Sequence, residues 1–228
     1  MKLKKLFKSL SKFEIVLWIS SLVVVSGAFI ISNSSDYLTL LASLIGVTAL
    51  IFVAKGYVIG QVLTVIFALF YGVISFHFKY YGEMITYLGM TTPIAILTVI
   101  SWLRHPYKET SEVEVRYMNK FQVLIMIILT LVVTVVFYFI LKALGTANLL
   151  FSTISISTSF LASYLTFMRN PFYGLGYGAN DIVLIILWII ASIENPSYIP
   201  MVVCFVMFLI NDCYGFFNWQ RMKKRQIV

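Results

Sequence analysis

Two acid–amide pairs interrupt apolar stretches of this chain. Asn180-Asp181 begins the segment NDIVLIILWII, and Asn211-Asp212 lies within MVVCFVMFLINDCYGFFNW. A carboxylate at membrane depth costs roughly 2.5–3.5 kcal/mol on insertion scales, so it is rarely kept there without a partner or a function. The two pairs therefore predict a polar pathway or a binding site inside a membrane protein.

The first pair belongs to a mixed aromatic and polar helix face. Tyr177, Asp181 and Trp188 fall on one side of a helix, with Asp181 near the centre of its span. Such a face suits a site that stacks a flat ring and hydrogen bonds its polar edge, and a cationic ring would be attracted to both Trp and Asp. The alternative is an Asp181 that only bonds a neighbouring helix.

The second pair offers a different kind of recognition. We expect Asn211 to be the better site candidate, because its amide can form two complementary hydrogen bonds with a carboxamide. Asp212 lies nearer the end of the span, and we expect Trp219 to belong to the interfacial aromatic belt.

Two further helices carry polar stripes. The third span predicts an inward-facing stripe that lines the pathway or packs helices together, made of Gln61, Thr64, Ala68, Tyr71 and Ser75. The serines of the sixth span, including Ser155, are more typical of close helix packing. Glu83 is expected to be a solvated or helix N-terminal acid, and Pro93 is expected to kink the fourth span.

The composition indicates the kind of fold that positions these residues. Of 228 residues, 61% are hydrophobic and 11% are charged, against roughly 25% charged in a soluble domain. We therefore predict an all-α integral membrane protein, a single domain over 1–228 with the lipid bilayer as its solvent. Eight spans are predicted, at 13–31, 38–54, 57–76, 83–103, 121–141, 148–168, 178–193 and 198–219.

The basic residues indicate the orientation. With eight spans, all of the 17 lysines and arginines except Lys79 and Lys142 fall on one side of the membrane. The positive-inside rule places that side, and both termini, in the cytoplasm of a cell. Basic charge arranged in this way reports membrane orientation, so it gives no support to a nucleic-acid partner.

A weak internal repeat organises the spans. Lys55-Gly56 and Arg169-Asn170 mark similar hinges, and the segments that follow end at Trp102 and Trp219. This predicts two parallel triple-helix bundles, at 38–103 and 148–219, joined by a linker helix at 121–141 and preceded by an extra N-terminal helix at 13–31. Parallel repeats of this kind recur in transporters.

The sequence excludes several classes. It contains no HExxH, GxSxG or Walker A pattern and no His cluster, so we expect no enzyme, no cofactor and no metal site. Cys204 and Cys213 lie on different helix faces and are expected to be buried apolar thiols. The oligomeric state is left open, including a homo-oligomer.

Three stretches carry a family resemblance. KGYVIGQVLTVIFALFYGVISFHFKYYGEMI, NPFYGLGYGANDIVLIILW and FLINDCYGFFNWQRM resemble the PnuC family of vitamin-precursor transporters, over roughly residues 38–226. The resemblance implies a 3+1+3 fold related to the SWEET sugar transporters and facilitated, uniport-type uptake of nicotinamide riboside. The family's WxxWxxxN pattern corresponds here to Gly174, Tyr177 and Asp181, with Asn180 as an alternative amide.

The resemblance also completes the expected site. Trp188 and Tyr177 would frame the ring of a small-molecule substrate, and Asn180, Asp181 and Asn211 would bond its amide and ribose. Gln61 and Tyr71 would line the path from the first repeat. Alternatives are a transporter of thiamine, riboflavin or a deoxynucleoside, or a membrane interaction subunit that transports nothing.

Overall fold

The computed structural model describes residues 7–32, 36–77, 80–146 and 148–227. Its helices are α2 (Lys12–Ile31), α3 (Tyr37–Ala54), α4 (Val58–His77), α5 (Tyr81–Ile85), the π-helix η1 (Thr86–Thr91), α6 (Thr92–Arg104), α7 (Lys120–Ala143), α8 (Leu149–Phe167), α9 (Tyr173–Glu194), the short 3₁₀-helix η2 (Pro196–Tyr198) and α10 (Ile199–Ile227). Together they supply eight candidate membrane spans in the described residues, which confirms the all-helical, eight-span prediction. Lys79 lies outside the described residues.

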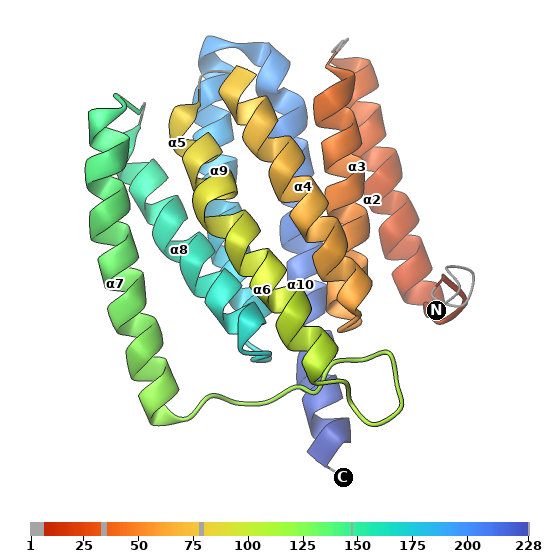
Figure 1. The fold of residues 1–228 in the computed structure, drawn as a ribbon. Helices are drawn as coiled ribbons and strands as arrows, with labels where there is room; N and C mark the ends of the chain where they lie inside the picture. Colours follow the sequence, from red (N-terminus) through yellow and green to blue (C-terminus); the bar gives the residue numbers. More distant parts are fainter. Residues whose placement is uncertain (1–6, 33–35, 78–79, 147, 228) are drawn as a thin grey trace.

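Six of the spans form a closed ring. α3 packs against α4, α4 against α6, α6 against α8, α8 against α9, α9 against α10, and α10 returns to α3 (Figure 1). α2 packs on the outside of α3 and α10, whereas α7 packs on α8 at the opposite edge of the bundle. The ring therefore encloses a space to which both predicted triplets contribute.

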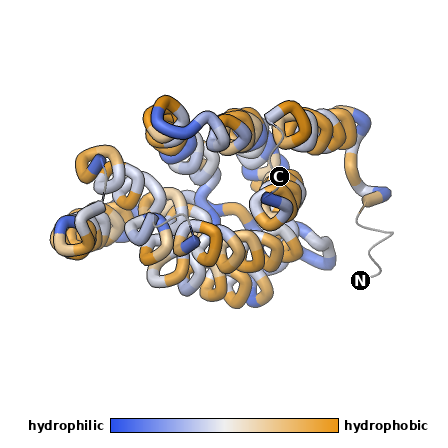
Figure 2. The backbone as a smooth tube through the Cα atoms, turned by 90° about the horizontal axis from the view of Figure 1, so that it is seen from above, coloured by the Kyte–Doolittle hydropathy of each residue, from blue (hydrophilic) through white to orange (hydrophobic). Residues whose placement is uncertain are grey.

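The bundle presents apolar side chains to its surroundings. α7 buries only Met126 and Leu141 among its own residues, and its remaining length is largely apolar. Hydropathy viewed from above shows hydrophobic residues along all the helices (Figure 2). Such a surface is stable when lipid covers it. Cys213 is exposed on this surface, contrary to the prediction that both thiols are buried, whereas Cys204 is buried.

The two predicted hinges have the same backbone geometry. Gly56 and Arg169 both have positive φ, at 68° and 57°. Each follows the last turn of a helix, and each is succeeded by a residue whose amide reaches back five residues: Tyr57 to Phe52 O at 3.0 Å and Asn170 to Leu165 O at 2.9 Å. The same helix-ending motif at both hinges is consistent with the predicted duplication.

A pair of tryptophans links the two halves at this end. Trp102 Nε1 donates to Thr166 O at the end of α8 (3.1 Å), and Trp219 Nε1 donates to Val53 O at the end of α3 (2.9 Å). The two rings lie 5.4 Å apart and both are buried. The expectation that Trp219 belongs to the interfacial belt is therefore wrong, because its indole N–H has a carbonyl partner inside the protein and does not need the headgroup region.

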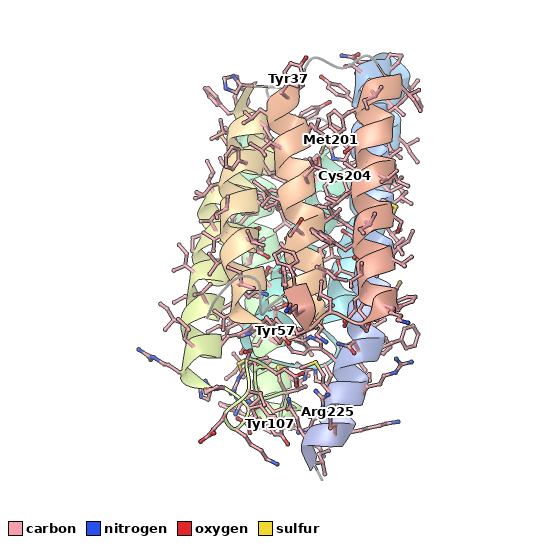
Figure 3. The ribbon with its side chains drawn as sticks, turned by 90° about the vertical axis from the view of Figure 1, so that its right-hand side faces the viewer. Tyr37, Tyr57, Tyr107, Met201, Cys204 and Arg225 are labelled. Atoms are coloured by element: carbon pink, nitrogen blue, oxygen red, sulfur yellow. The ribbon has the colours of Figure 1, made fainter. Side chains whose placement is uncertain are left out.

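The loop after α6 closes this end from below. Val113 N donates to Gly56 O (2.9 Å) and Arg116 N donates to Arg169 O (3.0 Å), so the loop contacts both hinges. Arg169 also pairs with Glu114 at 3.3 Å; burial and the neighbouring Arg116 lower the pKa of Arg169, and Glu114 opposes that shift. Figure 3 shows Tyr107 of this loop beside Arg225, which lies on the lower end of α10, with Tyr57 above both.

The fourth span is irregular next to Pro93, where the sequence predicts a kink. The π-helix Thr86–Thr91 precedes the proline, and Thr92 Oγ1 donates to Tyr87 O at 2.8 Å, five residues back. A π-bulge widens a helix locally and is common at functional sites. Here it places Tyr87 and Thr91 toward the space inside the ring.

Candidate functional site

A central cavity with a volume of about 60 Å³ lies inside the ring of six helices. The described residues that line it come from five of the ring helices and η1: Gly46, Ala49, Leu50, Val53, Gln61, Thr64, Phe67, Tyr87, Thr91, Ser159, Tyr177, Asn180, Asp181, Phe205, Phe208 and Asp212.

The cavity contains polar atoms that the protein leaves unsatisfied. Asp181 is 3% exposed, and its Oδ2 atom has no hydrogen-bond partner among the described residues; the same holds for Thr91 Oγ1 across the cavity. A buried polar atom without a partner costs about 1–3 kcal/mol, and more when it is charged. A polar ligand that supplied the missing partners would recover that cost.

A second carboxyl group stands beside the first. Asp212 of α10 is also 3% exposed, lines the same cavity and interacts with the side chain of Asp181. None of the described lining residues is Lys, Arg or His. The cavity is therefore acidic, with no built-in basic partner along its described lining, and it favours a cation over an anion.

Asn180 adds a directed amide. Its Oδ1 accepts a hydrogen bond from Thr158 Oγ1 at 3.0 Å and a long one from Ser155 Oγ at 3.5 Å. These bonds orient the amide group of Asn180, which lines the cavity. Gln61 on α4 supplies a second amide at the lining and is 3% exposed. Ser155, expected to serve packing alone, thus also orients a cavity residue.

Aromatic rings form much of the wall. Phe67 meets Phe208 edge-on at 5.5 Å and Tyr87 edge-on at 6.1 Å between ring centroids. Gly46 lets the rings of Phe208 and Phe67 approach α3 closely, because a Cβ at this position would collide with Phe208 and press on Phe67. Aromatic walls of this kind suit a flat ligand ring.

The structure brings four of the seven predicted site residues to the cavity. Tyr177, Asn180, Asp181 and Gln61 line it. Tyr177 also shares a hydrogen bond with Ser163, with 3.3 Å between their hydroxyl oxygens. The predicted helix face of Tyr177, Asp181 and Trp188 therefore does not line one cavity. Trp188 lies farther along α9, at a second pocket near the end of the bundle opposite the described termini.

Trp188 and Tyr71 instead form a layer beside the cavity. Trp188 Nε1 donates to the Tyr71 hydroxyl at 3.1 Å, and the Tyr71 ring lies 4.3 Å from that of Tyr87. Tyr87 lines the central cavity, whereas Trp188 lines the second pocket. This aromatic layer, defined as Tyr71, Tyr87 and Trp188, therefore connects the lining of one space to the lining of the other.

The seventh predicted residue, Asn211, faces another helix. Its Nδ2 donates to Ser21 Oγ of α2 at 3.0 Å and to Met207 O at 2.8 Å. It is absent from the described lining of the cavity, where its neighbour Asp212 is present. Asn211 therefore attaches the additional helix α2 to α10. Asp212 lines the cavity, where the sequence had predicted Asn211.

Sequence reasoning also missed Tyr87 and Ser159. Tyr87 lies in the π-helix, whose widened turn shifts the helix face and so defeats the regular spacing of three or four residues. Ser159 belongs to a serine stripe that is indistinguishable by pattern from a packing face. Pro93, which follows Thr91-Thr92, was the sequence feature that could have indicated the irregular helix around Tyr87.

The departure from the WxxWxxxN pattern has a structural reason. A Cβ at Gly174 would lie 2.6 Å from Asp212 O and 2.7 Å from Phe216 N, both backbone atoms of α10. The helices α9 and α10 are too close here for any side chain, so a tryptophan could not be accommodated without moving them. Tyr177 retains an aromatic ring at the second position of the pattern, and it lines the cavity.

Comparison with known proteins places this architecture in a family. Residues 36–221 match the family described as nicotinamide mononucleotide transporter. The chain is 27% identical over 97% of its length to the nicotinamide riboside transporter PnuC of Neisseria mucosa, covering 86% of that protein, and 23% identical over 93% of its length to that of Haemophilus influenzae, covering 92% of it.

A solved structure shares the fold. The crystal structure of the vitamin B3 transporter PnuC superimposes with a TM-score of 0.85 at 27% identity, covering 97% of this chain and 96% of that one. No group of metal-ligating side chains occurs within the residues that the structure describes. From the match over most of its length, from its eight candidate spans and from the six-helix ring with its central cavity, this chain belongs to the nicotinamide mononucleotide transporter (PnuC) family of membrane transporters, not to an enzyme family.

Proposed function

We propose that this protein carries nicotinamide riboside across the cytoplasmic membrane by facilitated diffusion. The observation that carries the proposal is the unpartnered carboxylate oxygen of Asp181 in an aromatic-walled cavity whose described lining has no basic residue. The substrate named for the two relatives has a permanently cationic pyridinium ring, a carboxamide and a ribose. Each part has a chemical counterpart in this cavity.

The roles follow from position. Asp181 faces the cationic ring or a ribose hydroxyl, and Tyr177, with the phenylalanines of the wall, provides the stacking surface. Asn180 Nδ2 and the Gln61 amide donate to the carboxamide or the ribose. Asp212 keeps the cavity acidic beside Asp181.

The charge of the cavity favours the riboside over the mononucleotide. A phosphate monoester carries about −1.5 to −2 charge at pH 7. It would face both Asp181 and Asp212 without a basic residue in the described lining to offset the repulsion. Among the alternative substrates, riboflavin and deoxynucleosides lack the positive charge that this cavity favours. Thiamine has a cationic ring and is the strongest competitor.

The direction and energy source complete the proposal. The chain has no Walker A motif, so it equilibrates its substrate and does not pump it with ATP. The hinges, the loop below them and the ends of α6 and α10 lie together at one end of the bundle, where most of the basic residues gather. We assign this end to the cytoplasm by the positive-inside rule.

The experiment is uptake by the purified protein in liposomes. Labelled nicotinamide riboside is supplied outside, and thiamine, riboflavin, deoxyadenosine and nicotinamide mononucleotide serve as unlabelled competitors. We expect saturable uptake that unlabelled riboside suppresses and the mononucleotide does not. Suppression by thiamine alone, without riboside uptake, would transfer the assignment to thiamine. Absence of uptake of every compound would favour a subunit that does not transport.

A further inference from the structure

A second pocket, here called the upper pocket, lies at the end of the bundle opposite the described termini. It has a volume of about 80 Å³ and lies where α5, α8 and α9 meet the loop before α8. Tyr80, Trp188, Glu83, Glu194 and Thr146 are among its lining residues. It shares none of its described lining residues with the central cavity.

Glu83 is the residue that requires an explanation. It lies in the first turn of the short helix α5, where an acid could bond free backbone N–H groups. Its Oε2 atom is nevertheless shielded from solvent and has no hydrogen-bond partner among the described residues. Thr146 Oγ1, also on the lining, is buried without a partner as well. Glu83 is therefore a helix N-terminal acid, as predicted, but one of its carboxylate oxygens is buried without a partner.

The other lining residues define the ligand that would satisfy Glu83. Glu83 and Glu194 are the charged residues of the described lining, and both are acidic. The Trp188 ring meets Tyr80 at 5.3 Å and Tyr198 at 5.6 Å, so aromatic faces and edges surround the same space. Carboxylates combined with aromatic rings recognise organic cations, especially quaternary nitrogen.

The pocket is also placed in series with the central cavity. Trp188 belongs to its lining and is joined through Tyr71 to Tyr87, which lines the central cavity. A ligand that left the upper pocket toward the middle of the bundle would meet this aromatic layer first. The two acidic spaces are thus linked by a chain of three aromatic side chains in contact with one another.

We propose that the upper pocket is a first binding site, which holds a flat organic cation between Glu83 and Trp188 before the aromatic layer opens. This inference rests on the proposed function for the identity of the transported cation. A first site of this kind raises the local concentration of a cationic substrate and does not need to act in the later steps. Removing it changes the apparent affinity for a charged substrate more than the maximal rate.

The transport test uses Glu83→Gln, which keeps the size of the side chain and removes its charge. Uptake of nicotinamide riboside is compared with uptake of its uncharged 1,4-dihydro form. We expect KM for the cation to rise roughly three- to tenfold, with kcat little changed and with KM for the uncharged form within twofold of the parent. Glu194→Gln should change KM in the same direction by less, and Glu109→Gln, on the exposed loop at the other end, serves as the charge-matched control.

Equal effects of Glu83→Gln on the charged and uncharged forms would overturn the proposal, as would no effect on either. A binding measurement separates this outcome from a failure of the proposed function. We would titrate the purified protein with 1-methylnicotinamide, a flat cation without a ribose, by calorimetry. We expect Asp181→Asn to retain binding and Glu83→Gln to weaken it at least threefold. Binding lost in Asp181→Asn and retained in Glu83→Gln would assign the cation to the central cavity alone, whether or not the riboside is transported.

Discussion

Replacing Asp181 with Asn tests the chemistry of the central cavity most sharply. The substitution preserves the volume of the side chain and one oxygen acceptor, but it removes the charge from a residue that is 3% exposed. A hydrogen bond to a charged group contributes about 1.5–3 kcal/mol, so we expect the dissociation constant for nicotinamide riboside to rise by about one to two decades. Isothermal titration of the detergent-purified protein measures this directly.

The neighbouring carboxyl group of Asp212 is the reason to expect an increase in the dissociation constant near the lower end of that range. Asp212 lines the same cavity and can partly replace the lost charge, so Asp181→Asn alone should cost less than Asp181→Asn combined with Asp212→Asn. Glu14→Gln provides a matched control, because Glu14 is a buried carboxylate of α2 that bonds Tyr214 at 2.6 Å and pairs with Lys55 at 3.3 Å. It should lower stability and leave affinity within a few-fold. Parental affinity in both Asp181→Asn and the double variant would refute the site.

Four further outcomes follow from the same geometry. Tyr71→Phe leaves the buried Trp188 indole N–H without its partner, so thermal unfolding should show a loss of about 1–3 kcal/mol, and an unchanged melting curve would contradict the predicted role of that bond. Trp102→Phe and Trp219→Phe each remove one of two equivalent bonds, so their destabilisations should agree within about 1 kcal/mol in a denaturant titration. Adding ATP inside sealed vesicles should leave uptake of the riboside unchanged, and accumulation driven by a proton gradient would contradict uniport. A C-terminal reporter that is active only after export should stay silent if both termini lie in the cytoplasm, as the positive-inside rule predicts.

The sequence predicted the spans well because lipid imposes a strong constraint. A helix that crosses a bilayer needs about 20 apolar residues, and that signal does not depend on packing. The hinges could also be predicted, since Gly56 and Asn170 stand in polar breaks between apolar runs. Both hinges adopt the same helix-ending geometry in the structure.

The site was harder to predict because its residues depend on helix rotation. Asn211 and Asp212 are adjacent, yet a step of about 100° on a helix sends one toward α2 and the other into the cavity. Nothing in the span itself fixes that rotation; it follows from the contacts of α10 with α2, α3 and α9. A similar limit applied to Trp219, which sits at the depth of an interfacial residue but is buried between the two halves.

Trp188 shows a second limit, which concerns depth. It shares a face with Asp181, but a helix rises about 1.5 Å per residue, so the step of seven residues separates the two side chains by about 10 Å along the axis. That distance is enough to place Trp188 in the upper pocket and Asp181 in the central cavity. Residues that share a helix face can therefore line different pockets.

Counterflow in liposomes tests the central claim most directly. Vesicles that contain the purified protein are loaded with a high concentration of unlabelled nicotinamide riboside and diluted into a trace of the labelled compound, without ATP or an ion gradient. A facilitated carrier should give transient accumulation of label above equilibrium in the parent and a strongly reduced overshoot in Asp181→Asn. Absence of an overshoot in the parent, with a strong overshoot when thiamine replaces the riboside, would contradict the account.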